Sequence, residues 1–517
     1  MVEPAPQRFN MARYCVGPGL ARRPDHVGLV VVHDPLDPLR GAERWTYAEL
    51  HEAVTACAAG LLAHGIRPGE RLVLRMGNTS DYALLFFGAI AAGIIAVPTS
   101  AQLTAEEVGF VLSDSGATAL AVSAGLDVDT DLPRVAPDDV ARWRRSGERP
   151  AYLAGGYADT DAEQAAFMVY TSGTTGVPKG VLHAQRSAWG RRPMYAGWYG
   201  IGADDVVLHA GAFNWTYTLG TGLTDPWANG ATAVIYDGER DPAVWSRIIA
   251  ATGATMFAAV PGVFRQLLAR GQLDRRALRT MRHGLTAGEA LTPALWTSWR
   301  ETTGTELYEA LGMSEISTFV SSGPGVPTRP GSPGRPQPGR RVAVLPVEGG
   351  TDPLPAGERG LLAVHGSDPG LMLEYWNRPQ EQAEAFRGDW FVSGDLVHLD
   401  EDGYIVHHGR TDDVMTSMGY RVSPLEVERC LAQHPAVADV AVTEVAVRDG
   451  VNIITAFVVP TEPGQGSLPD PAVLIAHTRA HLAAYKCPRE VVFVRVLPRT
   501  PNGKILRRKL REGAAAG

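Results

Sequence analysis

Apolar and polar positions alternate along the chain in blocks whose spacing predicts helices and strands in turn. Apolar residues recur at helical spacing over residues 47–64, and the short apolar run at 71–76 predicts a strand. The longest apolar stretch, residues 82–97, is interrupted by Gly88 and Gly93, which predicts a buried helix followed by a buried strand. A membrane span needs about 20 apolar residues, so this stretch is not expected to cross a membrane.

The same alternation resumes at Gln164 and indicates the fold class. Strand-like apolar runs follow at residues 165–169, 206–208, 231–236 and 254–259. Helices that alternate with strands predict an α/β protein, with layers of helices on largely parallel sheets. Proline and glycine are frequent at 323–339, and the short strands expected at 341–345 and 360–365 predict a small β-rich subdomain there.

The end of the chain carries strand and helix signals of its own. Strands are expected at 440–447, 453–459 and 491–496, and a helix at 472–482. At 517 residues the chain is too long for a single hydrophobic core. We therefore predict two domains, a large N-terminal α/β domain at 1–410 and a small C-terminal α+β domain at 411–517.

Composition and charge narrow the possible classes of protein. Hydrophobic residues at 45% and charged residues at 20% are typical of a globular protein, and the net charge of −8 argues against a nucleic-acid partner. The one basic run, residues 507–509, is expected to be a solvated helix face. No secretory signal is visible, and the cysteines lie far apart without metal-ligand spacing, so a reducing, cytoplasmic location is expected. These cysteines are Cys15, Cys57, Cys430 and Cys487.

One loop suits a polyphosphate ligand. The string YTSGTTGVPKG at residues 170–180 follows a strand-like run and ends with a single lysine. Glycines let backbone N–H groups approach phosphate oxygens, hydroxyls donate hydrogen bonds, and Lys179 adds a positive charge. The string is not a Walker A loop, because Pro178 precedes the lysine and Gly180 follows it. An ordinary surface turn is the alternative interpretation, which the length of the string disfavours.

This loop is similar to the phosphate loop of the adenylate-forming superfamily, which includes acyl-CoA synthetases, luciferases and the adenylation domains of peptide synthetases. Further strings resemble that family's motifs in the expected order. They are EALGMSE at 309–315, WFVSGD at 390–395, GRTDDVMTSMGYRVSPLEVE at 409–428 and PRTPNGKI at 498–505. The chain is therefore identified as a member of the superfamily, and it resembles acyl- and aryl-CoA synthetases of the benzoate-CoA ligase and medium-chain type.

The resemblance implies activation of a carboxylic acid by ATP. The carboxylate attacks the α-phosphorus, pyrophosphate leaves, and the acyl group of the resulting adenylate passes to CoA. Because the carboxylate is already a nucleophile, catalysis is mainly positioning and neutralisation of charge. By resemblance, Lys504 is the catalytic lysine that bridges the acid and the nucleotide. Glu315 would hold Mg²⁺, and Lys179 and Ser314 would contact the phosphates.

The resemblance also implies the contacts of the nucleotide. The phosphate loop would supply Thr171, Ser172, Gly173, Thr174 and Thr175, and the adenine side would be formed by Gly288, Glu289, Glu309, Ala310 and Leu311. Leu311 stands where many relatives have tyrosine, so an aliphatic side chain would pack on the adenine. Asp395 would accept hydrogen bonds from both ribose hydroxyls, assisted by Arg410. Asp412 would be the hinge about which the C-terminal domain rotates as a mobile lid.

The acid pocket is expected between residues 214–217, 286–290 and 311–313. It would be compact, apolar and aromatic, and it would suit an aromatic or a short apolar acid. Its lining would be Phe213, Trp215, Tyr217, Gly312 and Met313. Ordinary core packing is the alternative interpretation of these aromatic residues.

CoA is the expected acceptor. Gly419 and Tyr420 resemble the segment along which pantetheine enters, and Arg448 and Lys486 match positions that contact the CoA nucleotide in medium-chain relatives. ATP, Mg²⁺ and CoA are therefore the expected cofactors, with a small carboxylic acid as substrate.

Other acceptors and one other class of protein stay open at this point. The acyl group could pass to a carrier protein in trans or to an amine. An adenylating enzyme with a changed nucleophile, such as nitrite for the diazotisation of an aryl amine, would carry ATP motifs similar to these. A non-catalytic binding protein is disfavoured, because Lys504, Glu315 and Asp395 are all present.

Overall fold

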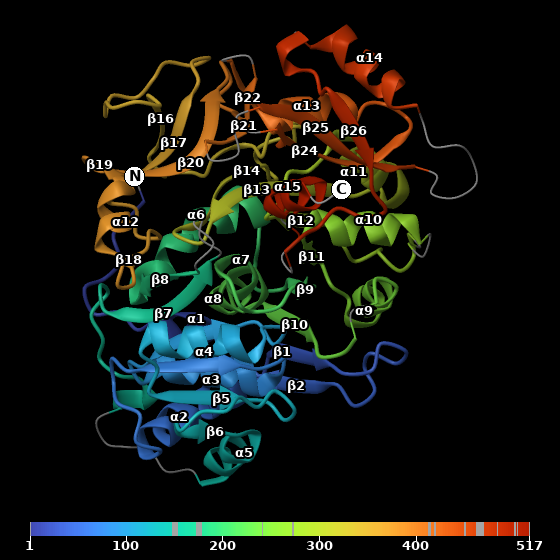
Figure 1. Cartoon of the computed structure of the whole chain (residues 1–517). Coiled ribbons are helices and arrows are strands. Elements are labelled where there is room, and N and C mark those ends of the chain that lie inside the picture. Colours follow the sequence, from blue (N-terminus) through green and yellow to red (C-terminus); the bar gives the residue numbers. More distant parts are fainter. Residues whose placement is uncertain are drawn as a thin grey trace. The chain divides into compact units, whose positions relative to one another are not determined.

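The computed structural model describes most of the chain (Figure 1). The chain divides into two compact units. The described residues are 2–146, 153–171, 178–239, 241–270, 273, 275–411, 415–417, 420–448, 451–461, 470–482, 484–500, 503 and 505–515. The first unit comprises Met1–Val342 and Val364–Phe391, and the second comprises Ala343–Ala363 and Val392–Gly517. The predicted domain boundary near residue 410 stays a prediction.

A seven-stranded sheet forms one layer of the first unit, in the order β18-β8-β7-β4-β3-β5-β6. Its strands are β3 (Arg71–Arg75), β4 (Ile95–Thr99), β5 (Ala119–Val122), β6 (Arg134–Val135), β7 (Ala165–Thr171), β8 (Lys179–Ala184) and β18 (Glu374–Tyr375). The strands from β7 to β6 are parallel, whereas β8 runs antiparallel to β7 and β18 runs antiparallel to β8. The edge formed by β8 and β18 carries part of the candidate site.

A nine-stranded sheet forms a second layer of this unit, in the order β15-β14-β13-β12-β11-β9-β10-β1-β2. Its strands are β1 (Val27–Val32), β2 (Glu43–Thr46), β9 (Val206–His209), β10 (Thr232–Tyr236), β11 (Met256–Ala259), β12 (His283–Ala287), β13 (Glu306–Met313), β14 (Ser317–Ser321) and β15 (Arg335–Pro336). The strands from β13 to β1 are parallel, and antiparallel strands close both edges. Ligands bind at the carboxyl ends of parallel strands in open sheets of this kind.

Helices lie against both sheets of the first unit (Figure 1). They are α1 (Met11–Arg22), α2 (Tyr47–Ala63), α3 (Ser80–Ala91), α4 (Ala105–Ser115), α5 (Pro137–Ser146), α6 (Arg192–Met194), α7 (Thr216–Leu219), α8 (Asp225–Ala228), α9 (Val244–Thr252), α10 (Pro261–Ala269), α11 (Pro293–Thr303) and α12 (Pro379–Glu384). Single turns of 3₁₀-helix or π-helix occur in this unit at Ala154–Gly156, Gln185–Ser187, Trp189–Arg191, Tyr195–Tyr199 and Gly220–Thr224, and one occurs in the second unit at Ala484–Lys486. The predicted α/β fold class is confirmed.

The long apolar stretch at 82–97 folds as predicted, because α3 leads into the buried strand β4. Both α2 and α3 are buried over most of their length. A Cβ on Gly88 would lie 2.6 Å from Cβ of Cys57, so only glycine lets the two helices approach this closely. Among the described residues, no helix is both long enough and apolar enough to cross a membrane. The cytoplasmic location stays a prediction.

Three further sheets lie wholly or mainly in the second unit. The first of them is formed by the strands β16 (Val342–Leu345), β17 (Gly360–His365), β20 (Trp390–Leu399), β19 (Phe386–Arg387) and β21 (Ile405–Arg410), of which β19 falls within the residue range of the first unit. The others are the pair β22 (Met415–Ser417) and β23 (Tyr420–Val422), and the sheet of β24 (Val437–Arg448), β25 (Val451–Pro460) and β26 (Glu490–Phe493). The helices are α13 (Pro424–Leu431), α14 (Pro471–His481) and α15 (Arg507–Ala515). The strands and the helix expected near the C-terminus are thus confirmed.

One expectation about this unit is partly wrong. The basic run at 507–509 begins α15, but the side chain of Arg507 is only 11% exposed, and its Nη2 lies 2.6 Å from Oε1 of Glu428. Glu428 is buried on α13 and also accepts a hydrogen bond from the N–H of Val442. Arg507 therefore stabilises the buried carboxylate, whereas Arg508 and Lys509 are exposed as expected.

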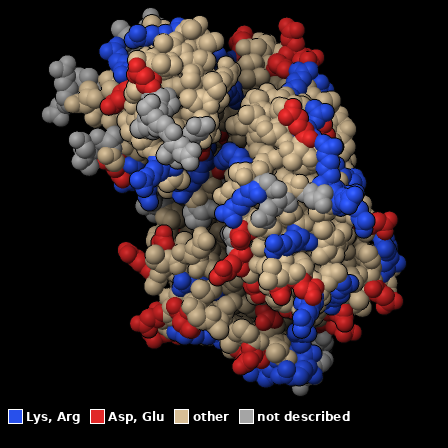
Figure 2. All heavy atoms as spheres, turned by 90° about the vertical axis from the view of Figure 1, so that its right-hand side faces the viewer, with Lys and Arg blue, Asp and Glu red and all other residues tan. Residues whose placement is uncertain are grey.

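The face of the molecule in Figure 2 carries both signs of charge. Lys and Arg side chains lie among Asp and Glu side chains over this face. The sequence carries 48 basic and 56 acidic residues, which gives the net charge of −8.

Candidate active site

The pairing of β7 with β8 brings the two described ends of the phosphate loop together. Thr171 pairs with Lys179 in the register of this antiparallel pair. The Nζ atom of Lys179 lies 3.7 Å from Oε1 of Glu381 and 5.5 Å from the ring centroid of Tyr375. Residues 172–177 of the loop, with the predicted contacts Ser172, Gly173, Thr174 and Thr175, lie outside the described residues.

Tyr375 joins two residues that were predicted from separate motifs. Its hydroxyl donates a hydrogen bond of 2.6 Å to Oε1 of Glu315, and its ring lies under the ammonium group of Lys179. The N–H of Met372 donates to the carbonyl O of Glu315 at 2.7 Å, which fixes the backbone at the same point. Sequence reasoning missed Tyr375, because only the pairing of β18 with β8 brings it here.

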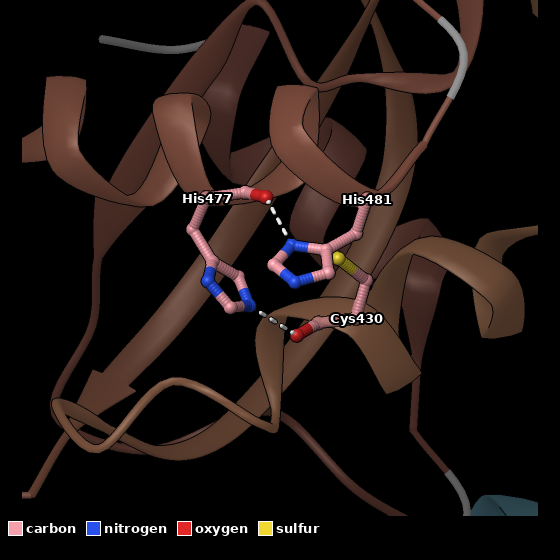
Figure 3. A group of neighbouring side chains, drawn as sticks. All are labelled: Cys430, His477 and His481. Carbon is pink, nitrogen blue, oxygen red and sulfur yellow. Dashed lines mark hydrogen bonds between the residues drawn. The ribbon is translucent and has the colours of Figure 1, made fainter.

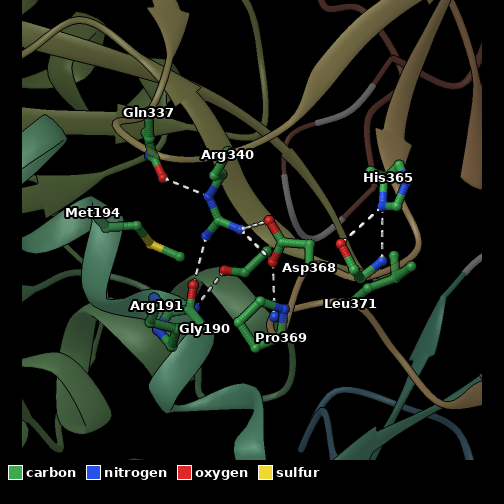
Figure 4. A network of polar contacts seen from close by, with 12 residues as sticks. Gly190, Arg191, Met194, Gln337, Arg340, His365, Asp368, Pro369 and Leu371 are labelled. Atoms are coloured by element: carbon green, nitrogen blue, oxygen red, sulfur yellow. Dashed lines mark hydrogen bonds and ion pairs between the residues drawn. The ribbon is translucent and has the colours of Figure 1, made fainter. Parts of the chain in front are cut away.

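A buried ion pair supports the loop that leads to Tyr375 (Figure 4). Nη1 of Arg340 lies 2.8 Å from each carboxylate oxygen of Asp368, and the two side chains are 0% and 2% exposed. Arg340 also donates to Oε1 of Gln337 and to the carbonyl O of Gly190, and Asp368 accepts from the N–H of Gly370. Through these contacts Arg340 and Asp368 tie the segment after β17 to Gln337 and Gly190.

His183 holds the backbone at Ser314. Its Nε2 donates to the carbonyl O of Ser314 at 2.8 Å, and its ring stacks on Phe167 with 4.7 Å between centroids. Burial lowers the pKa of His183 to about 4, so the ring is neutral at pH 7 and the donating nitrogen carries its proton. The predicted contact of Ser314 with the phosphates stays a prediction.

The turn between β13 and β14 is held by a second buried network. A Cβ on Gly312 would lie 2.3 Å from the carbonyl O of Ser317, so this position requires glycine. Ser317 has a φ of 66°, and its Oγ accepts from Nη1 of Arg191. Arg191 in turn binds both oxygens of the fully buried Asp225, at 2.7 and 2.6 Å, and Asp225 also accepts from the hydroxyl of Tyr199. The network fixes the turn that carries Glu315.

The residues predicted for the adenine side lie together at the carboxyl ends of β12 and β13. Ala287 pairs with Ala310 across these parallel strands, which places Gly288 and Glu289 beside Leu311. Glu309 is buried, and its Oε1 accepts a hydrogen bond of 3.0 Å from the N–H of Leu291. This hydrogen bond from Leu291 to Glu309 stabilises the turn that follows β12. Glu289 forms an ion pair of its own, because its Oε2 lies 3.3 Å from Nη2 of Arg265. The contacts of these residues with adenine stay predictions.

The residues predicted for the acid pocket differ in exposure. Trp215 is half-buried and meets Tyr217 edge to face, with 5.3 Å between ring centroids. A Cβ on Gly288, whose φ is 92°, would lie 2.9 Å from Cη2 of Trp215. Tyr217 is buried with its hydroxyl donating to the carbonyl O of Ala259, whereas Phe213 is buried against Tyr82. The structure thus brings Trp215 to the exposed turn at Gly288, and Leu311, Gly312 and Met313 are half-buried.

The second unit holds a buried carboxylate at Asp395. Its Oδ1 accepts from Nε2 of His407 at 3.1 Å, and Nη1 of Arg410 lies 3.7 Å away, since Asp395 and Arg410 pair directly across β20 and β21. Burial opposes ionisation, but the hydrogen bond from His407 and the charges of His407 and Arg410 outweigh it and lower the pKa of Asp395 to about 2. Asp395 is therefore an ionised acceptor at pH 7. Sequence reasoning missed His407, which lies on the strand opposite Asp395.

Several predicted residues cannot be placed. Asp412, Gly419 and Lys504, and the side chains of Tyr420 and Arg448, lie outside the described residues. Lys486 is described, and its Nζ lies 2.5 Å from Oε1 of Glu426 on α13. A role of Lys486 in binding CoA would require this ion pair to open.

Comparison with known proteins identifies the family. The family model "AMP-binding enzyme" matches residues 20–376, and "AMP-binding enzyme C-terminal domain" matches residues 426–504. The chain therefore belongs to the AMP-binding enzyme family, as predicted from its motifs. It is an AMP-forming acid–CoA ligase, which activates a carboxylic acid as an acyl-adenylate and transfers the acyl group to CoA.

Three known proteins illustrate the similarity. The chain is 32% identical over 527 residues to the 3-hydroxybenzoate–CoA ligase of Aromatoleum sp. (strain CIB), with 98% of each chain covered. Its structure is similar to that of the anthranilate CoA ligase AuaEII in complex with anthranoyl-AMP, with a TM-score of 0.87, 28% identity and 99% of each chain covered. It is also similar to a benzoate CoA ligase from Burkholderia xenovorans LB400, with a TM-score of 0.86, 30% identity and 97% and 100% of the two chains covered.

Proposed function

We propose that the acid is an aromatic carboxylate of the benzoate class, and that the ligase uses ATP with Mg²⁺ to activate it. The observation that carries this proposal is the meeting of Trp215 with the turn at Gly288, at the carboxyl end of β12. The edge of the Trp215 indole lies beside this glycine, and an aromatic substrate ring packs on an indole edge to face or in an offset stack. The relatives named for benzoate, 3-hydroxybenzoate and anthranilate support the same class.

The charged side chains of the first unit suit the departure of pyrophosphate. Lys179 and the hydroxyl of Thr171 would neutralise and hold the phosphates as charge shifts onto them. Tyr375 keeps Glu315 oriented, and Lys179 beside Tyr375 brings a positive charge to the same edge. No general base is needed, since the substrate carboxylate is ionised at pH 7.

Glu315 is the residue that would hold Mg²⁺. It offers a hard oxygen donor, and only one of its two carboxylate oxygens has a hydrogen-bond partner among the residues that the structure describes. When bound, Mg²⁺ would neutralise the phosphate charge. The donor set therefore fits the ion, with waters and phosphate oxygens as further ligands.

The second unit carries the residues predicted for the ribose and for CoA. Asp395 is buried, ionised and already positioned by His407. Its carboxylate is therefore suited to accept hydrogen bonds from the two ribose hydroxyls. Lys504 would bridge the acid and the nucleotide during adenylation only, and Asp412 would be the pivot of the C-terminal lid. CoA would enter along Gly419 and Tyr420, with Arg448 and Lys486 near its phosphates.

Acid-dependent exchange of pyrophosphate into ATP tests the proposal directly. The purified chain is assayed with benzoate, 3-hydroxybenzoate and anthranilate, and with butyrate and hexanoate as linear controls. We expect exchange with at least one aromatic acid to exceed that with the linear acids by about tenfold or more, the discrimination that an apolar pocket supplies. Faster exchange with the linear acids would contradict the assignment of the substrate class.

Tyr375→Phe is expected to weaken Mg²⁺-dependent adenylation. Loss of a hydrogen bond to a charged group costs about 1.5–3 kcal/mol, so the rate at limiting Mg²⁺ should fall roughly 10- to 100-fold. Excess Mg²⁺ should restore part of the loss, because the change acts through the orientation of Glu315. The measurement is pyrophosphate exchange as a function of Mg²⁺ concentration.

A matched control is available in Tyr404→Phe, which removes a hydroxyl from a buried tyrosine of the second unit. Its Mg²⁺ dependence should equal that of the unmodified enzyme. A Tyr375→Phe variant with the normal Mg²⁺ dependence would show that the hydrogen bond to Glu315 plays no part in ion binding.

Trp215→Ala is expected to enlarge the acid pocket. Preference should shift towards bulkier acids by about 1–3 kcal/mol of discrimination, the range typical of apolar pockets. The measurement is kcat/KM for benzoate against a para-substituted benzoate, compared with the same ratio for Trp296→Ala. Trp296 lies on α11 under the guanidinium of Arg300, so its removal should leave the ratio unchanged. A Trp215→Ala variant that loses stability but keeps the normal ratio would assign Trp215 to the core.

A further inference from the structure

A cysteine and two histidines meet where α13 packs against α14 (Figure 3). Their candidate ligand atoms, one from each of Cys430, His477 and His481, all lie within 4.8 Å of one another. Cys430 is buried in the last turn of α13, His477 is half-buried, and His481 is exposed. The two histidines are four residues apart on α14, so they share one face of the helix.

The linear sequence hides this group. The cysteines show no metal-ligand spacing along the chain, and Cys430 is 47 residues from His477. In the folded chain α13 contacts α14, and this contact places the thiol of Cys430 beside the two histidines.

Both imidazole rings are already held by main-chain hydrogen bonds. Nε2 of His477 donates to the carbonyl O of Cys430 at 3.0 Å, and Nδ1 of His481 donates to the carbonyl O of His477 at 2.8 Å (Figure 3). The hydrogen bond of His481 fixes the tautomer whose Nε2 is unprotonated, which is the form that binds metals. The structure gives Sγ of Cys430 no hydrogen-bond partner within the described part of the chain.

We propose that Cys430, His477 and His481 bind one transition-metal ion of the Zn²⁺ class. A thiolate with two imidazoles is a ligand set for Zn²⁺ in tetrahedral geometry, and water would take the fourth position. On binding, the S–H bond of Cys430 breaks, a sulfur–metal bond forms, and the proton passes to solvent. Nε2 of His477 would give up its hydrogen bond to Cys430 and bind the metal, or the imidazole ring would flip by about 180° and present Nδ1 to the metal.

The present separations are close to those of a bound site. Metal–ligand bonds of about 2.0–2.3 Å place tetrahedral ligand atoms roughly 3.5 Å apart. Side-chain rotations that move the ligand atoms by about 1 Å would therefore bring them to bonding distance of one ion. The three ligands include no carboxylate, which favours Zn²⁺ over the hard ions Mg²⁺ and Ca²⁺. The Mg²⁺ that the reaction is proposed to use would therefore not compete for this site.

An ion here would join the end of α13 to the end of α14. The segment that follows α14 carries Lys486, whose partner Glu426 lies on α13. The ion and the ion pair would thus connect the same two parts of the unit. Binding to the folded state alone raises stability by mass action, so Zn²⁺ is expected to raise the Tm.

The test is a titration of the metal-free full-length chain with Co²⁺ and then with Zn²⁺. Co²⁺ should give the sulfur-to-metal charge-transfer absorption and the visible bands of a tetrahedral site, and one equivalent of Zn²⁺ should remove them. Cys430→Ser should abolish the charge-transfer band. His477→Gln and His481→Gln should each weaken Zn²⁺ binding by about 100-fold or more, since each removes one ligand of three.

Two variants serve as matched controls. Cys487→Ser removes another buried thiol of the second unit, and His434→Gln removes a ring that lies 5.3 Å from that of His477. Both should keep the Co²⁺ spectrum and the rise in Tm. His481 is exposed, so His481→Gln should fold normally, which unchanged pyrophosphate exchange without added Zn²⁺ would verify.

Two results would overturn the proposal. One is a Co²⁺ spectrum without the sulfur charge-transfer band. The other is Zn²⁺ binding that Cys430→Ser and His481→Gln leave unchanged, which would assign the ion to unrelated surface histidines among the 14 in the chain.

Discussion

Replacement of Lys504 with alanine is expected to reduce adenylate formation by roughly 10²–10³-fold, while thioester formation from a preformed acyl-adenylate continues. The motif around Lys504 resembles that of the catalytic lysine of the family, whose charge is needed while pyrophosphate leaves. Removal of one group that stabilises transition-state charge costs about this factor in rate. The adenylate already carries a good leaving group, so the second half-reaction does not need the same charge.

The two half-reactions are measured separately for this variant. Pyrophosphate exchange reports adenylation, and synthetic benzoyl-AMP with CoA reports thioester formation. Lys509→Ala is the matched control, because Lys509 is an exposed lysine on α15 and should change neither rate. Equal losses in both half-reactions for Lys504→Ala would refute the division of roles.

Replacement of Asp395 with alanine is expected to raise the KM for ATP by about 100-fold or more. Two hydrogen bonds from ribose hydroxyls to a charged group would be lost, each worth about 1.5–3 kcal/mol. The His407 and Arg410 side chains would also lose the carboxylate that they contact in the buried environment. The KM for ATP of Asp395→Asn should lie between those of the unmodified enzyme and of Asp395→Ala, because the amide oxygen accepts a hydrogen bond but carries no charge.

Steady-state kinetics in ATP give the measurement. Glu401→Gln, an exposed carboxylate in the turn between β20 and β21, is the matched control and should leave the KM unchanged. If Asp395→Ala bound ATP normally while losing stability, the carboxylate would be structural and would not contact the ribose.

The lowered pKa of Asp395 also predicts a pH dependence. The pKa is about 2 in the folded chain against an ordinary 3.8, so the ionised form is favoured by folding. Its contribution to stability is fully present above the ordinary pKa and is lost as the pH falls towards 2. Between pH 8 and pH 5, titration of Asp395 should therefore contribute no change to the free energy of unfolding.

Those parts of the fold were predictable whose secondary structure follows from the local pattern of apolar residues. The apolar stretch at 82–97 with its two glycines indicated α3 and β4, and short apolar runs indicated β3, β7, β9, β10 and β11 of the two sheets. Glu315 and Asp395 were predicted as site residues because each stands in a string that resembles the family's, and their roles stay predictions. Their structural partners were not predicted.

Those partners come from distant segments. Tyr375 reaches Glu315 only because β18 pairs with β8, and His407 reaches Asp395 only across a hairpin. No local pattern marks either residue. Arg507 was wrongly expected to be fully solvated, because its run of basic residues gave no sign of the buried Glu428 opposite it.

The central claim is that this ligase converts an aromatic acid into its CoA thioester through an acyl-adenylate. The most direct measurement is the mass and amount of every product formed from benzoate-class acids, ATP, Mg²⁺ and CoA. We predict aroyl-CoA, AMP and pyrophosphate in equal amounts, and accumulation of aroyl-AMP when CoA is omitted. Adenylate that forms readily but gives no thioester at millimolar CoA would contradict the claim, and it would point to a carrier protein, an amine or nitrite as the partner of the adenylating chemistry.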